Sequence, residues 1–194
     1  MTRRGFLGGG VAMAAIGACA DPGLASVSNP GVPERSTPIV PAGAGGLKAF
    51  RARCIGCQLC VTACPEKVLR PSAGLGRFPV PEMGFEYGYC RPACTRCAAA
   101  CPAGAIVALS EETRLRTQIG RAIWHKDRCI AAKNKVRCTA CERHCPVKAI
   151  SLVDGVPAID SGRCIGCGAC ENLCPARPFP AIVIEGCEMH SICR

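Results

Sequence analysis

Residues 164–175 read CIGCGACENLCP, in which three cysteines are separated by two residues each and a fourth cysteine directly precedes a proline. Variants of this block recur at residues 54–65, 90–102 and 129–146. Three thiolates placed this closely can ligate three corners of one 4Fe-4S cubane, while the cysteine before the proline ligates a neighbouring cubane. The proline suits that position because its locked φ turns the chain away from the loop. The four blocks therefore predict four 4Fe-4S clusters.

The predicted ligands are sixteen of the 19 cysteines. If consecutive blocks pair, the first three cysteines of each block share a cluster with the last cysteine of the partner block. This pairing gives a first set (Cys54, Cys57, Cys60, Cys101), a second set (Cys64, Cys90, Cys94, Cys97), a third set (Cys129, Cys138, Cys141, Cys174) and a fourth set (Cys145, Cys164, Cys167, Cys170). An alternative nests the blocks, first with fourth and second with third, and uses the same ligands. We favour consecutive pairing.

Zinc sites and disulfides are the other common uses of closely spaced cysteines. Structural zinc sites usually draw their ligands from two separated CxxC knuckles, not from three cysteines in one tight loop. Cysteines three positions apart are poorly placed for relaxed disulfides. Neither alternative explains the repeated proline, so iron–sulfur ligation accounts best for the pattern.

The composition favours a fold that is organised by its cofactors. The chain has 194 residues with 22 Gly, 16 Pro and only 4% aromatics, so we do not expect a large hydrophobic core. Cluster binding then contributes folding free energy, and the protein without clusters should be largely disordered. The formal net charge is +10, but each cubane with four thiolates carries about −2. Loss of Arg3 and Arg4 with a leader peptide brings the loaded protein close to neutral, and we expect no nucleic-acid partner.

The N-terminus resembles a twin-arginine signal peptide over residues 1–20. Its Thr2-Arg3-Arg4-Gly5-Phe6-Leu7 motif precedes a weakly apolar stretch, which is typical of such leaders. This route exports folded proteins, so clusters can be inserted in the cytoplasm before export. The mature protein is therefore expected in the periplasm, and no apolar run reaches the roughly 20 residues that a membrane-spanning helix needs.

Two processing sites overlap at the end of this leader. Ile16-Gly17-Ala18-Cys19 resembles a lipobox, which would make Cys19 a lipidated first residue, whereas Ala18-Cys19-Ala20 fits an ordinary cleavage site. We favour a lipid anchor at Cys19, because the Pro/Gly-rich stretch over residues 21–46 is typical of a tether.

The blocks predict two domains of the α+β class. Strand-length apolar runs follow each Cys-Pro pair, at residues 67–69, 105–109, 149–153 and 181–184. A strand, a cluster loop, a helical turn and a second strand form one unit, and two units form one two-cluster domain. After a disordered leader and linker, we expect two tandem bacterial two-cluster 4Fe-4S ferredoxin-type domains at residues 47–110 and 121–187. A helix that starts at Ser110 would connect them.

The layout resembles the NapG/MauM type of ferredoxin-like proteins of periplasmic nitrate reduction and methylamine utilisation. The similarity covers nearly the whole chain. It includes the leader, the regular first and fourth blocks, Cys101-Pro102-Ala103-Gly104-Ala105-Ile106 after the irregular second block, and Ile119-Gly120-Arg121-Ala122 before the third. The short second block and the lipobox depart from that family. The resemblance implies electron transfer on the outer face of the cytoplasmic membrane, from a membrane-bound quinol-oxidising or ferredoxin-like donor to a soluble redox enzyme.

We therefore expect an electron carrier and not an enzyme. Every cubane corner is assigned to a cysteine, and the sequence has no nucleotide-binding glycine motif or catalytic triad pattern. One alternative is the iron-sulfur beta subunit of a molybdenum-type oxidoreductase, and another is an interaction or maturation factor with structural clusters. Trp124, Tyr87 and Tyr89 are expected to cover the cubanes. Cys187 and Cys193 lie outside the ligand sets, either as a disulfide or as free thiols in a disordered tail.

Overall fold

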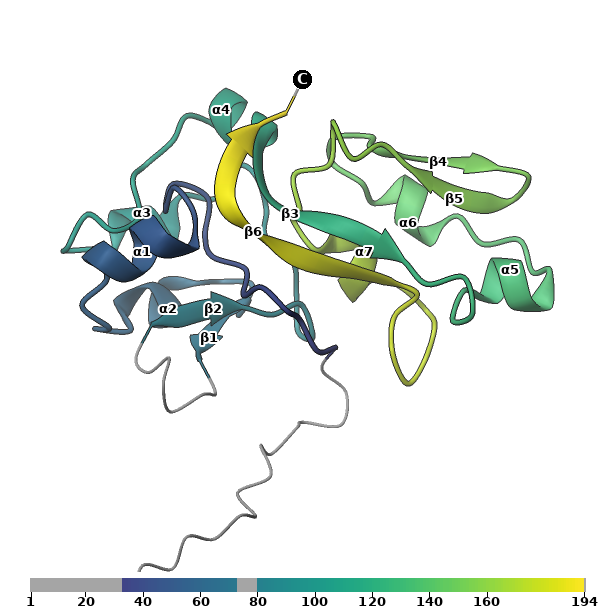
Figure 1. Ribbon diagram of the computed structural model, residues 1–194, viewed down its shortest axis with the longest axis horizontal. Coiled ribbons are helices and arrows are strands. Elements are labelled where there is room, and N and C mark those ends of the chain that lie inside the picture. Colours follow the sequence, from purple (N-terminus) through teal and green to yellow (C-terminus); the bar gives the residue numbers. More distant parts are fainter. Residues whose placement is uncertain (1–32, 73–79, 194) are drawn as a thin grey trace, which may run out of the picture.

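The computed structural model describes residues 33–72 and 80–193. Short helices alternate with short strands along the chain (Figure 1). In chain order the elements are α1 (Leu47–Arg53), α2 (Leu59–Ala63), β1 (Leu69–Pro71), β2 (Pro81–Met83), α3 (Arg96–Ala99), α4 (Glu111–Arg116), β3 (Thr117–Trp124), α5 (Ile130–Asn134), α6 (Ala140–Arg143), β4 (Ile150–Val153), β5 (Val156–Ile159), α7 (Ala169–Asn172) and β6 (Ile182–Ile192). Within the described ranges no helix is long and apolar enough to cross a membrane.

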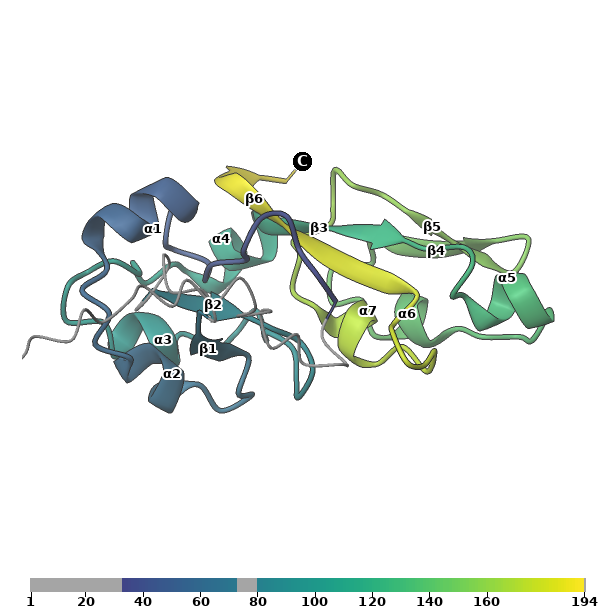
Figure 2. The same ribbon diagram turned by 60° about the horizontal axis from the view of Figure 1, so that its bottom comes forward.

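Within residues 33–72 and 80–193, three antiparallel strand pairs organise the two halves of the chain. In the second half, β3 pairs with β6, and β4 pairs with β5. The hairpin of β4 and β5 lies between β3 and β6 in the sequence. The hairpin turns at Asp154 and Gly155, which both have positive φ, as a two-residue turn of this kind requires. In the first half, β1 pairs with β2. Both views place α1, α2 and α3 at one end of the molecule and α5 at the other (Figures 1 and 2).

Residues 33–46 belong to the folded part of the molecule, which corrects the expectation of a disordered linker through residue 46. Ile39, Val40 and Ala44 are fully or almost fully buried. The carbonyl of Ile39 accepts a 2.8 Å hydrogen bond from the N–H of Met83. Pro and Gly in this stretch shape a tight chain path and do not make it a free tether. The export leader and Cys19 lie outside the described residues.

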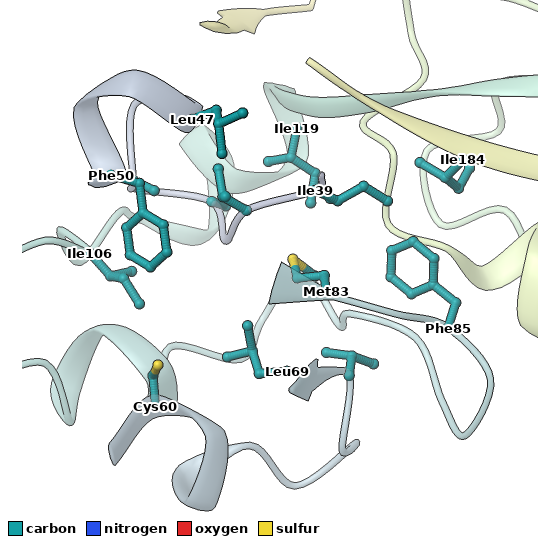
Figure 3. Packing of buried hydrophobic residues seen from close by; sticks show 14 of the residues in the cluster. Ile39, Leu47, Phe50, Cys60, Leu69, Met83, Phe85, Ile106, Ile119 and Ile184 are labelled. Carbon is teal, nitrogen blue, oxygen red and sulfur yellow. The ribbon is translucent and has the colours of Figure 1, made fainter. Parts of the chain in front are cut away.

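The apolar core runs across both halves. Figure 3 shows Ile39, Met83 and Phe85 of the first half with Ile119 and Ile184 of the second half in one packed cluster. Cys60 and Cys170 are buried in the same cluster. The core is therefore continuous with the cysteine loops, and the cofactor sites and the apolar packing depend on one another.

The connection between the halves contains the expected helix. The Ser110 side chain accepts a hydrogen bond from the N–H of Thr113 and caps α4. Glu111 and Glu112 lie in the first turn, where carboxylates favour the positive end of the helix dipole. The apolar run over residues 105–109 differs from expectation, because it forms no strand in the structure and makes a backbone bond from Val107 to Gly43 instead.

The C-terminal segment continues as strand β6 through Ile192, so the alternative of a disordered tail that carries Cys187 and Cys193 is wrong. Strand β6 continues past residue 187 and pairs with β3 again at Ser191 and Ile192, after a register shift. The N–H of Cys193 also donates to the carbonyl of Arg116 at 2.6 Å. The last residues of β6 therefore bind the C-terminal end of the chain to the end of α4 and the start of β3.

Candidate iron–sulfur centre

Each block places its third cysteine in a short helix and its fourth cysteine just after that helix. Cys60, Cys97, Cys141 and Cys170 lie in α2, α3, α6 and α7. The helices end within four or five residues. The cysteine that follows then leaves the helical path, so it can face a different site from the three before it.

Left-handed backbone positions shape the loops of the two regular blocks. Gly56 and Gly166, each two residues after the first cysteine of its block, have φ of 68° and 75°. Gln58 and Gly168, each just after the second cysteine, have φ of 62° and 85°. Glycine adopts these angles without steric cost. The repeated sequence therefore produces the same loop twice.

Backbone N–H groups point at several of the thiols. Gly56 donates to Cys54 Sγ at 3.4 Å, and Ala149 donates to Cys145 Sγ at 3.2 Å. Ala181 donates to Cys174 Sγ at 3.2 Å. Such donors stabilise thiolate charge and orient the ligand, and they raise the reduction potential of a bound cluster.

The first set lies at the end of the molecule near α1 and α3. Burial raises the pKa of the Cys60 thiol to about 11, and the other causes are the nearby Cys97, Cys54, Cys101 and Cys57. Cys101 therefore lies beside the first block, as consecutive pairing requires. Among the cysteines that the structure describes, Cys57 alone is classed as exposed.

The second set lines one cavity. Cys64, Cys90, Cys94 and Cys97 all face an empty space of ≈ 410 Å³, which includes solvent at its mouth. Burial raises the pKa of the Cys90 thiol to about 12, and Arg114 opposes that shift. The four thiols come from the two blocks that consecutive pairing joins.

The third set lines a second cavity of ≈ 320 Å³, again including open solvent. Its four thiols are Cys129, Cys138, Cys141 and Cys174. Burial raises the pKa of Cys141 to about 11. Trp124 lies in the wall of this cavity, as expected of a covering side chain, whereas the side chain of Tyr87 is 81% exposed.

The fourth set is buried as deeply as the third, with two buried and two partly buried thiols. The pKa of Cys167 is raised to about 12 and that of Cys170 well above its ordinary value, in both cases mainly by burial. The neighbouring Cys145 and Cys164 also contribute to raising the pKa of both thiols. All four sets thus follow consecutive pairing, and the nested alternative does not match the neighbours that the structure brings together.

The two halves meet at the second and fourth sets. The N–H of Cys90 donates to the carbonyl of Cys167 at 2.9 Å. Asn172 Nδ2 donates to the carbonyl of Phe85 at 2.7 Å, and a Cβ atom on Gly168 would overlap the Phe85 ring. The sets are therefore arranged in the order first, second, fourth, third.

Four cysteine thiols around one largely apolar cavity are the donor set of a 4Fe-4S cluster, so the residues fit this cofactor. Among residues 33–72 and 80–193, no three His, Cys, Asp or Glu side chains are arranged to hold a single metal ion. Cys187 and Cys193 are free thiols outside the four sets. The disulfide alternative for these two cysteines does not match the structure.

Two charged side chains near the sites were not identified from the sequence. Arg114, in α4, is 3% exposed and lines the cavity of the second set. Glu171, in α7, is 4% exposed and forms an ion pair with Arg35. Arg114 lies in a polar, charged stretch and Glu171 stands between two cysteines of the fourth block, so only their tertiary contacts identify them.

Comparison with known proteins yields a consistent family. A profile described as a 4Fe-4S dicluster domain matches residues 53–105 and 128–177. All sixteen cysteines of the four sets lie within these two segments.

Several proteins are similar over most of the chain. The methylamine utilization ferredoxin-type protein MauM of Methylobacillus flagellatus is 33% identical over 69% of this chain and 62% of its own length. The ferredoxin-type protein NapG of Haemophilus influenzae is 32% identical over 74% of this chain and 55% of its own. The ferredoxin-type protein NapF of Escherichia coli K12 is 31% identical over 75% of this chain and 85% of its own. The chain thus spans less than two thirds of the length of this MauM protein and of this NapG protein.

Proposed function

Because this chain belongs to the ferredoxin-type proteins with 4Fe-4S dicluster domains, we propose that it is an electron carrier and not an enzyme, and that it moves electrons through four clusters held by its four cysteine sets. The donor would be a membrane-bound quinol-oxidising or low-potential redox protein. The acceptor would be a redox enzyme on the periplasmic side of the cytoplasmic membrane. A bound 4Fe-4S cluster supplies one-electron chemistry at a potential that its surroundings adjust.

The observation that carries this proposal is the continuous order of the ligand sets. Within each half, each block supplies three cysteines to one set and its fourth cysteine to the other set. The two sets of a half are therefore held close together by the same short stretches of chain. Between the halves, the Cys90–Cys167 hydrogen bond holds the second and fourth sets together. The protein thereby provides a chain of four adjacent sites instead of two separate pairs.

The ends of this order are the first and third sets, and partners should approach there. Cys57 is exposed in the first set, and the neighbouring Ile55 and Leu59 are 67% and 48% exposed. At the third set, Lys133 and Lys135 are exposed on and beside α5. The exposed apolar groups at the first set favour a partner with an apolar contact surface, and the exposed lysines at the third set favour a partner with an acidic contact surface.

The export and anchoring proposals rest on the sequence. The twin-arginine motif supports transport of a folded, cluster-loaded protein. A lipid on Cys19 would hold the carrier near a membrane-bound donor. Ile39 and Val40 are buried in the core, so they cannot be part of a tether. Any tether would consist of residues that precede this packed segment.

An EPR-monitored redox titration of the mature protein, purified without oxygen, tests the proposal. Iron and acid-labile sulfide are counted on the same sample. We expect about sixteen of each and reversible, mutually interacting signals. Substantially fewer irons, or bound zinc without a reducible signal, would overturn it. Full loading without reduction at accessible potentials would instead indicate structural clusters.

A further inference from the structure

Arg114 is a buried cation beside the second set. It lies in α4 and is 3% exposed. Its Nε donates a 2.7 Å hydrogen bond to the carbonyl of Pro92. Its Nη1 is buried and, within the described residues, has no hydrogen-bond partner. Arg114 lines the same cavity as the four thiols of the second set.

A buried guanidinium with an unpaired N–H is costly unless an anion compensates it. None of the ion pairs found among the described residues involves Arg114. Among the described residues that line this cavity, Glu66 has the one carboxylate, and it pairs with Arg91 at 2.7 Å. The negative charge that Arg114 faces is therefore the thiolate-ligated site itself.

We propose that Arg114 tunes the second cluster: its Nη1 donates a hydrogen bond to a cluster sulfur, and its charge raises the reduction potential of that cluster. This inference rests on the proposed function, because it requires a 4Fe-4S cluster at the second set. Reduction adds one electron and makes the cluster more negative, so a fixed neighbouring cation favours the reduced state. Burial strengthens the effect because solvent does not screen it.

Trp124 provides a neutral counterpart at the third set. It lines the cavity of that set, and its Nε1 is likewise buried without a partner among the described residues. An indole N–H can donate to a cluster sulfur but carries no charge. The second cluster should therefore be held at a higher potential than the third, and a partly reduced protein should hold its electron on the second cluster.

The test is an anaerobic EPR redox titration of the cluster-loaded protein and of Arg114→Gln and Arg114→Lys. Reducing equivalents come from dithionite in the presence of mediators. The matched control is Arg91→Gln, which removes the same charge from the wall of the same cavity but from a side chain that is 62% exposed. The Cys94→Ala variant identifies which signal belongs to the second cluster.

We expect Arg114→Gln to lower the reduced-to-oxidised ratio of the second cluster at least tenfold at a fixed potential, about 59 mV for a one-electron couple. Arg114→Lys should keep most of the shift, and Arg91→Gln should change the ratio by much less than Arg114→Gln. An unchanged potential in a fully loaded Arg114→Gln protein would overturn the inference while leaving the electron-transfer proposal intact. A wild-type protein that binds no reducible cluster would instead overturn the proposed function.

A second measurement needs no variant of Arg114. Pulsed EPR on reduced protein labelled with ¹⁵N-arginine should show a weakly coupled nitrogen at the second cluster. The coupling should persist in Arg91→Gln, which removes the other arginine in the cavity wall. Its absence in that labelled protein would overturn the inference, even if Arg114→Gln fails to assemble its clusters.

Discussion

The backbone N–H of Cys90 donates a 2.9 Å hydrogen bond to the carbonyl oxygen of Cys167. Cys90 belongs to the second set and Cys167 to the fourth, so the bond joins ligand loops from different halves of the chain. A main-chain contact of this kind fixes the two loops more closely than side-chain contacts alone would. The junction is therefore the structural basis for treating the four sets as one sequence of sites.

Gly168→Ala should open this junction. The residue has φ of 85°, and a Cβ atom would overlap the Phe85 ring. The left-handed backbone should cost about 1–2 kcal/mol, and the forced repacking roughly another 1–3 kcal/mol. Gly155→Ala is the control, with φ of 80° and open space around the site. Anaerobic thermal unfolding should show the larger loss for Gly168→Ala, together with weaker magnetic interaction between the second and fourth clusters. Equal losses would contradict the packing argument.

Arg35→Leu should loosen the N-terminal segment from the second half. Arg35 forms an ion pair with Glu171 and donates to the Ile184 carbonyl at 2.9 Å, and the pair is 6% and 3% exposed. Removing one partner leaves a buried charge and should destabilise the fold by about 3–5 kcal/mol. The control, Arg70→Leu, breaks half-exposed pairs with Glu82 and Glu86 and should cost at most about 1 kcal/mol. The stability of each variant is measured as the guanidinium concentration at which half of the cluster absorbance is lost. Similar shifts of this midpoint for the two variants would show that the buried pair contributes no more to stability than the exposed ones.

Replacing one predicted ligand should remove one cluster and spare the others. Cys138→Ala takes a thiol from the cavity of the third set, so bound iron should fall by about four atoms per chain. Cys187→Ala removes a thiol outside the four sets and should leave the iron content unchanged. Iron and sulfide assays on both purified variants make the comparison. Iron loss in Cys187→Ala would show that the ligand assignment is incomplete.

The stability of the protein should fall as the pH drops from about 6.5 toward 4, in part because of His190. Burial lowers the pKa of His190 from 6.5 to about 4, and neither ring nitrogen has a partner among the described residues. Between these values the unfolded chain binds a proton that the folded chain does not, so stability rises with pH there. His190→Leu should reduce this slope. Melting temperatures measured at pH 7, 6 and 5 test the prediction. It would be contradicted if the melting temperature depended on pH equally in His190→Leu and in the wild type.

Removal of the clusters should unfold most of the chain. The cysteine loops and the apolar core are interleaved, as the burial of Cys60 and Cys170 shows, so emptying the sites leaves buried thiols around cavities. Trp124, the single tryptophan, lines the cavity of the third set. Chelation and oxidation should therefore increase and red-shift its fluorescence and flatten the far-UV circular dichroism. A native-like spectrum after iron removal would show that the apolar core alone maintains the fold.

The spacing of the cysteines was sufficient to predict the kind of site, because thiolates in a tight loop before a proline have few other chemical uses. The resemblance to NapG and MauM proteins followed from the same blocks and is confirmed by the relatives. The helix start at Ser110 was also predictable, since its capping side chain acts on the next few residues. Each of these features depends on contacts that are local in sequence.

Features that depend on distant contacts were decided by the tertiary structure. The order of the ligand sets rests on the Cys90–Cys167 bond, and the role of Arg114 rests on its burial against a cavity. Residues 33–46 had the composition of a tether, yet Ile39 fills a gap beside Met83 in the core. Composition and spacing indicate which ligands a segment can bind and where it can form a turn. Whether a segment is buried depends on which other surfaces of the folded chain pack against that segment.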